Sequence, residues 1–86
     1  MQLLVLYRPN SEFARPTEEY VREFKRLHPE KEVVLMDIDS VEGLQKAQLY
    51  DVVRHPALLA VANDLNLLNS WVGEQMPLMD EVAAYL

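Results

Sequence analysis

The chain contains no cysteine in its 86 residues. Disulfide bonds, thiolate catalysis and thiolate metal sites are therefore excluded together. Its two histidines, His28 and His55, are not spaced as a metal-binding pair, so a structural zinc site would have too few ligands. Long apolar runs are absent as well, since none approaches the ~20 residues that span a bilayer. Zinc-stabilised and membrane-spanning architectures are thus not expected.

Positive charge is also in short supply. The 8 lysine and arginine residues stand against 14 aspartate and glutamate residues, which gives a formal net charge of −6. This balance repels phosphate groups, so nucleic acids and membrane surfaces are not expected as partners. The segment Met1–Tyr7 has neither the basic start nor the small-residue cleavage site of a signal peptide. A cytoplasmic location is therefore expected.

The most informative stretch that is present is centred on Pro56. Polar, turn-prone residues lead up to this proline, and the apolar run from Ala57 to Val61 follows it without a break. Such a run predicts a strand that is buried on both faces. Proline is tolerated at the first residue of a strand, although it lacks an N–H group. Because 86 residues leave room for only one core, residues 1–86 are expected to form a single domain.

Seven elements are predicted in the order strand, helix, strand, helix, strand, strand, helix. The strands are expected at residues 3–7, 32–39, 57–62 and 67–72, and the helices at about 12–27, 41–50 and from Pro77 to the end. Strands joined through a helix should be parallel, and the hairpin adds antiparallel pairing. The pattern predicts an α/β fold with a mixed four-stranded sheet.

Several local details follow from residue preferences. Asn10 or Ser11 is expected to cap the first helix and Ser40 the second, while Gly43 costs roughly 1 kcal/mol inside that helix. In the hairpin loop, an Asn or Asp rather than Leu65 is expected to take the left-handed conformation. The side chains expected to face the core are Phe13, Tyr20, Val21, Phe24 and Leu27 in the first helix, Leu44, Ala47 and Gln48 in the second, and Leu78, Val82, Tyr85 and Leu86 in the third.

This order of elements, with Pro56 in front of a central strand, resembles the thioredoxin/glutaredoxin fold family over nearly the whole chain. The resemblance implies a thioredoxin-like domain in which Pro56 is a cis-proline, and Trp71-Val72-Gly73 resembles the family's strand-ending glycine. Where glutaredoxins carry Pro-Gly-Cys-Pro-Tyr-Cys, this chain has Pro9-Asn10-Ser11-Glu12-Phe13-Ala14. Ser11 and Ala14 therefore occupy the positions of the two cysteines.

The family's redox activity does not transfer to this chain. Dithiol exchange needs an attacking thiolate and a resolving thiol, which serine and alanine do not supply. The segment from Pro9 to Ala14 also resembles the same region of the KaiB clock-adaptor family, which is cysteine-free and thioredoxin-like. Both resemblances imply a non-catalytic domain that binds a protein or peptide through the former active-site groove.

The groove is expected to be built from residues 9–14, His55-Pro56 and the segment from Trp71 to Glu74. In this family, the backbone before the cis-proline pairs with the backbone of a bound peptide, a form of strand addition that needs no particular side chain. The residues expected to bind a ligand or partner are Arg8, Pro9, Asn10, Ser11, Phe13, Arg15, Arg54, His55, Pro56, Trp71 and Gly73.

Alternative interpretations remain open at several of these positions. Ser11 is either a helix cap or a polar group near a ligand thiol, with His55 as a candidate base. Arg8, Arg15 and Arg54 are either solvated surface charges or a receptor for a carboxylate. These readings allow a glutathione-like small molecule or a transferase activity. A structural subunit that pairs through an edge strand as a weak homodimer is a further alternative. No metal or cofactor is expected.

Overall fold

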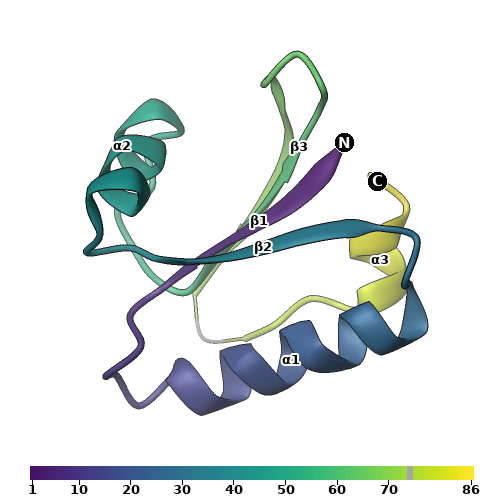
Figure 1. Ribbon diagram of the computed structural model, residues 1–86, viewed down its shortest axis with the longest axis horizontal. Helices are drawn as coiled ribbons and strands as arrows, with labels where there is room; N and C mark the ends of the chain where they lie inside the picture. Colours follow the sequence, from purple (N-terminus) through teal and green to yellow (C-terminus); the bar gives the residue numbers. More distant parts are fainter. Residues whose placement is uncertain (74) are drawn as a thin grey trace.

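The computed structural model describes residues 1–73 and 75–86 and contains the seven expected elements in the expected order. Its elements are β1 (Gln2–Tyr7), α1 (Ala14–Leu27), β2 (Glu32–Asp37), α2 (Val41–Leu49), β3 (Ala57–Val61), β4 (Leu67–Val72) and α3 (Met79–Ala83). The α/β class and the single mixed sheet are confirmed (Figure 1).

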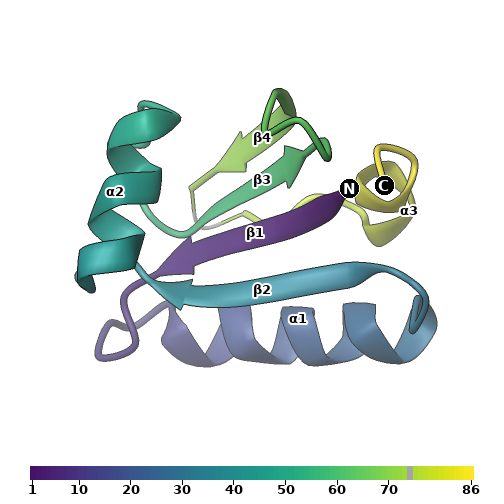
Figure 2. The same cartoon turned by 45° about the horizontal axis from the view of Figure 1, so that its top comes forward.

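The sheet has the strand order β2-β1-β3-β4. Strands β1 and β2 are parallel, whereas β3 is antiparallel to both β1 and β4. The two central strands are therefore β1 and β3, and they are the most apolar segments of the chain. Helices α1 and α3 pack on one face of the sheet and α2 packs on the other (Figures 1 and 2).

Strand β3 supplies both halves of the core, as its unbroken apolar run predicts. All five of its residues are buried. Leu59 packs with Leu4, Leu6 and Ala47 beneath α2, whereas Leu58 packs with Phe24 and Val82 beneath α1 and α3. Successive side chains of a strand point to opposite faces, so this one strand joins the two apolar layers.

Helix α1 begins at Ala14, two residues later than expected. The expectation that Asn10 or Ser11 caps it is wrong, because the capping position is Phe13 and no side chain caps the helix. The chain first makes a turn in which the N–H of Ser11 donates to the carbonyl of Arg8 at 3.1 Å. This turn uses the polar residues that a helix start would otherwise use. At the far end, Leu27 is exposed rather than buried.

Helix α2 starts as predicted, since the Ser40 hydroxyl accepts a hydrogen bond from the N–H of Gly43 at 2.9 Å. Gly43 itself lies against the turn that follows β2. A Cβ at this position would lie 2.9 Å from the carbonyl carbon of Asp37 and 3.0 Å from the Cα of Ile38. Of the three side chains expected to face the sheet, only Ala47 is buried, and Leu44 and Gln48 are exposed.

The remaining differences lie at turns. Strand β2 ends at Asp37 rather than Asp39, because the carbonyl of Asp37 accepts from Ser40 in a turn. In the hairpin loop Leu65 itself takes the left-handed conformation, with φ of 72°, which contradicts the expectation. Other segments also end earlier or begin later than expected: β3 ends at Val61, α2 at Leu49, and α3 begins at Met79 rather than Pro77.

The buried face of α3 is also narrower than predicted. Val82 is fully buried and Leu86 is partly buried against the same cluster, but Leu78 and Tyr85 are exposed. Tyr85 instead meets the edge of Trp71, with ring centroids 5.6 Å apart. No helix in residues 1–73 and 75–86 is long and apolar enough to cross a membrane.

Candidate functional site

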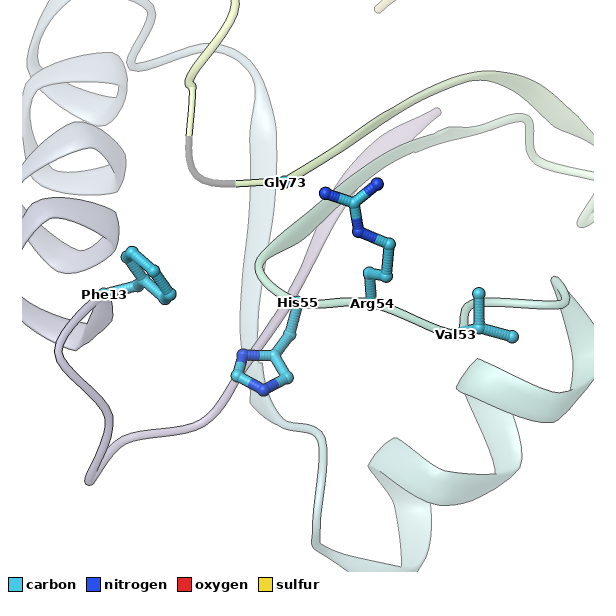
Figure 3. Close-up of a pocket in the computed structure, with 5 residues that line it drawn as sticks. All are labelled: Phe13, Val53, Arg54, His55 and Gly73. Carbon is cyan, nitrogen blue, oxygen red and sulfur yellow. The ribbon is translucent and has the colours of Figure 1, made fainter.

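A hollow of about 450 Å³ lies where the turn before α1 approaches the loop before β3. The residues that line it are Phe13, Val53, Arg54, His55 and Gly73. They come from three segments that are far apart in the sequence. Figure 3 shows Phe13 on the helix side of this hollow, with His55 and Arg54 on the loop side and Gly73 beyond them. Four of these five residues belong to the predicted set.

The loop between α2 and β3 is fixed at both of its ends. At its start, the N–H of Val52 donates to the carbonyl of Ala47 at 2.8 Å. At its end, Pro56 is fully buried, and its carbonyl accepts from the N–H of Gly73 at 2.9 Å. The peptide bond between His55 and Pro56 is cis. The loop between these anchors is therefore held against the end of β4.

Within residues 1–73 and 75–86, neither the backbone N–H nor the backbone C=O of His55 makes a hydrogen bond. The side chain is half-buried, and its Nδ1 atom is buried without a partner in the described part of the chain. Buried polar groups are ordinarily paired, so the unsatisfied Nδ1 atom is unusual, but it is enclosed and is not itself open to a ligand.

Gly73 lies on the opposite rim of the hollow, where its lack of a side chain leaves room for the Arg54 side chain. Its φ of 113° is in a region that residues with a side chain rarely adopt. A Cβ at this position would lie 3.5 Å from an Nη atom of Arg54, and Figure 3 shows the Arg54 side chain extending toward Gly73. The expected segment extends to Glu74, which lies outside the described residues.

Arg8 does not line the hollow, because it is engaged elsewhere. Its guanidinium donates to both carboxylate oxygens of Asp39, at 2.8 and 3.1 Å. These hydrogen bonds lower the pKa of Asp39 and raise the pKa of Arg8. The pair joins the turn before α1 to the turn before α2. Arg8 is thus already matched with a carboxylate, which weakens the case for a small-molecule carboxylate there.

The other predicted residues of this region do not line the hollow. Ser11 donates its hydroxyl hydrogen to the carbonyl of Arg8 at 2.7 Å, so its proton is used within the turn. Pro9 and Asn10 are exposed in the same turn, and Arg15 is exposed at the start of α1. The geometry therefore gives no specific support to a transferase that uses Ser11 and Arg8.

Trp71 lies at a different depression of the surface. Its indole N–H donates to Glu81 at 3.2 Å, and it lines a second hollow of about 500 Å³ beside the segment before α3. Trp71 and Gly73 were expected in one groove because Trp71-Val72-Gly73 resembles the family's strand-ending glycine. Alternation along β4 instead directs the Trp71 side chain toward α1 and α3.

Val53 lines the hollow but was not among the binding residues predicted from the sequence. Its side chain is 88% exposed, the most exposed of the large apolar side chains in the described residues. The available signal was its position among the few residues that lead to Pro56, where an apolar side chain has no strand or helix to pack into. In Figure 3 it lies on the side of the loop nearest α2.

The site offers binding groups but no thiol chemistry. Because the chain has no cysteine, a dithiol exchange of the thioredoxin type is impossible. The described residues contain no group of three or more His, Asp or Glu side chains that could hold a metal ion. What remains is a hollow with an aromatic ring, a cationic side chain and a backbone segment at His55 that has no hydrogen-bond partner among the described residues.

Comparisons with known proteins establish the fold. No family model matches the chain, and no curated protein matches it significantly. Among solved structures, mitochondrial thioredoxin 3 from Saccharomyces cerevisiae in its oxidised form is similar, with a TM-score of 0.73 and 14% sequence identity. The match covers 96% of this chain and 73% of that one. The chain therefore has a thioredoxin-like fold without the cysteines of a dithiol enzyme.

Proposed function

We propose that this domain binds an extended peptide or protein segment in the hollow between Phe13 and the loop 53–55. The observation that carries the proposal is that the N–H and C=O of His55, at the rim of that hollow, make no hydrogen bond to any other described residue. An extended backbone laid beside His55 would satisfy both groups, as in other cases where a peptide adds a strand. This mode needs no cysteine, which suits a redox-inactive domain.

The side chains around His55 would set which segment binds. Phe13 offers a half-buried aromatic ring, and Val53 offers an exposed apolar side chain on the other side of the loop. Arg54 adds a guanidinium near Gly73. Aromatic residues and arginine often contribute most of the energy of an interface. A segment with an apolar side chain beside an acidic one therefore fits the hollow best.

The experiment begins with selection of peptides from a random library on the immobilised domain, followed by titration of one synthetic peptide with NMR detection of backbone amides. We expect shifts concentrated at residues 13, 53–55 and 73. Phe13→Ala should weaken binding about tenfold, since one well-packed aromatic contact is worth roughly 1–2 kcal/mol. Leu44→Ala is the matched control, because Leu44 is an exposed apolar residue on α2 that does not line the hollow.

Two results would overturn this placement. One is that Phe13→Ala leaves the affinity of every selected peptide unchanged. The other is that the amide shifts fall around Trp71 and Glu81, which would assign binding to the second hollow. Glutathione is a useful comparison ligand, because shifts confined to residues 8–15 with glutathione alone would favour the small-molecule alternative.

A further inference from the structure

The strand β2 forms one outer edge of the sheet, with no strand beside it in the described residues. Figure 2 shows it below β1 and above α1 in that view, at the edge of the sheet. Edge strands usually carry features that prevent further pairing, such as central charges, prolines or bulges. The central residues of β2, Val33 to Met36, are all apolar and have none of these. The opposite edge, β4, is interrupted by a register shift opposite Ala60 and Val61.

The direction of the backbone groups on β2 can be deduced from one hydrogen bond. The N–H of Ile38 donates to the carbonyl of Tyr7 at 2.8 Å, so the even-numbered residues direct their backbone groups toward β1. Alternation then directs the backbone groups of Val33, Leu35 and Asp37 outward. Two groups at the ends are already used: the N–H of Lys31, the residue before β2, donates to the carbonyl of His28, and the carbonyl of Asp37 accepts from the N–H of Ser40.

The groups that stay available match one antiparallel register of β2 with a second copy of itself. We propose that two copies of this chain pair through β2, with a two-fold axis at Val34. In this register Val33 of each copy lies opposite Leu35 of the other and exchanges two hydrogen bonds with it. The free N–H of Asp37 then meets the free carbonyl of Lys31 at both ends. The ladder contains six hydrogen bonds and leaves no outward group between residues 31 and 37 unpaired.

Neighbouring registers fit less well. A two-fold axis at Val33 or at Leu35 makes only four of these hydrogen bonds, because each places a used group of Lys31 or Asp37 opposite a free one. Axes between residues are excluded, since they would place an outward residue opposite an inward one. The distribution of free and used backbone groups therefore selects the axis at Val34.

The charges along this edge are complementary in the same register. Lys31 of each copy lies opposite Asp37 of the other on the α1 side of the sheet. Lys31 also donates to the carbonyl of Leu86 at 2.8 Å, and its ammonium group has further donors to offer. Opposite charges facing each other across antiparallel strands favour pairing.

The flanking helix fits the same arrangement. Glu18, Arg22 and Lys25 of α1 line a hollow of about 340 Å³ with Leu35 along this edge. In the pair, the two α1 helices run antiparallel on one face of the joined sheet. Glu18 near the start of one helix then faces Lys25 near the end of the other. A second copy is thus the occupant whose charges match those of the edge.

The absence of cysteine makes the register directly testable. Val34→Cys places a thiol opposite its own copy, within the Cα separation of about 4.4–6.8 Å that a disulfide allows. Mild oxidation should therefore give mostly covalent dimer of twice 10.0 kDa. Val33→Cys is the matched control, because its own copy would lie ~8 Å away. We expect at least fivefold less dimer for it alone, and efficient cross-linking when it is mixed with Leu35→Cys.

A second measurement separates pairing from chance collision of thiols. The cysteine-free chain should shift from 10.0 kDa toward twice that mass in light scattering as its concentration rises. Val33→Pro removes an outward N–H while leaving the bonds to β1, so it should stay monomeric at tenfold higher concentration with an unchanged circular dichroism spectrum. A monomeric wild type throughout, or preferential cross-linking of Ser70→Cys on β4 over Val34→Cys, would overturn the proposal.

Discussion

The hydroxyl of Tyr7, at the end of β1, donates a hydrogen bond of 2.6 Å to the carboxylate of Glu18 on α1. This bond, with a smaller effect of burial and of the Glu18 charge, raises the pKa of Tyr7 from 10.0 to about 12. The folded protein therefore holds the Tyr7 proton more tightly than the unfolded chain does. The resulting stability is fully present below pH 10 and is lost as the pH rises toward 12.

Tyr7→Phe should lower the free energy of unfolding at pH 7 by about 1 kcal/mol, the usual value of one such hydrogen bond. The variant should also lose less stability between pH 10 and 12. Burial likewise raises the pKa of Tyr20 to about 12, so Tyr20 should contribute the same alkaline loss of stability in both proteins. Urea unfolding as a function of pH measures both effects. Glu18→Gln is the control, because the amide still accepts the bond without the charge. An alkaline slope identical in all three proteins would contradict this assignment.

At the scale of the element, α2 packs against the turn after β2 at Gly43. Gly43 was expected to weaken the helix, yet its lack of a side chain is what allows α2 to lie against the turn at Asp37 and Ile38. Gly43→Ala should destabilise the protein by about 1–3 kcal/mol, as overpacking does, although alanine is by ~1 kcal/mol the better helix former. Urea unfolding measures the change. Gln45→Ala, at an exposed position of the same helix, should leave stability within about 0.5 kcal/mol. A more stable Gly43→Ala variant would show that α2 can shift away from the turn.

The sequence predicts the helices and strands well because their apolar patterns are long. It predicts caps and turns less well, because several neighbouring polar residues can make the same hydrogen bond. Strand β4 was placed with its observed bounds, and the Ser40 cap was predicted correctly. Ser11 was misassigned because the same hydroxyl can cap a helix or bond to the carbonyl of Arg8 within a turn. Leu65 was misassigned because tertiary contacts, including the bond from the Tyr50 hydroxyl to its carbonyl at 2.9 Å, override its preference.

The candidate site shows the same division. Phe13, Arg54, His55 and Gly73 were predicted from the sequence, and the structure brings them to one hollow. Arg8 and Trp71 were assigned to it from their positions in the chain. The ion pair of Arg8 with Asp39 and the direction of the Trp71 side chain depend on residues that are distant in the sequence. The positions of residues along the chain therefore do not show which way a side chain points or which distant residue it pairs with.

At the scale of the whole molecule, the two apolar layers are joined by β3 and should unfold together. Leu58→Ala, in one layer, and Leu59→Ala, in the other, should each cost about 3 kcal/mol, a large part of the stability of a small domain. Trp71, the one tryptophan, reports on the layer beneath α1 and α3, whereas far-ultraviolet circular dichroism reports on all helices. Both signals should give the same urea midpoint in each variant. Separate midpoints for Leu59→Ala would mean that the α2 layer unfolds alone.

The position of the hollow, beyond the end of β1 and before the start of β3, has a geometric consequence for a pair joined through β2. The two-fold axis would reverse the direction of every strand, so the two hollows would open at opposite ends of one continuous sheet. Such a pair would have two separate binding sites that face away from each other, rather than one combined site. A ligand that carries two copies of a recognised segment at the right separation would be held with an avidity well above the affinity of either hollow alone.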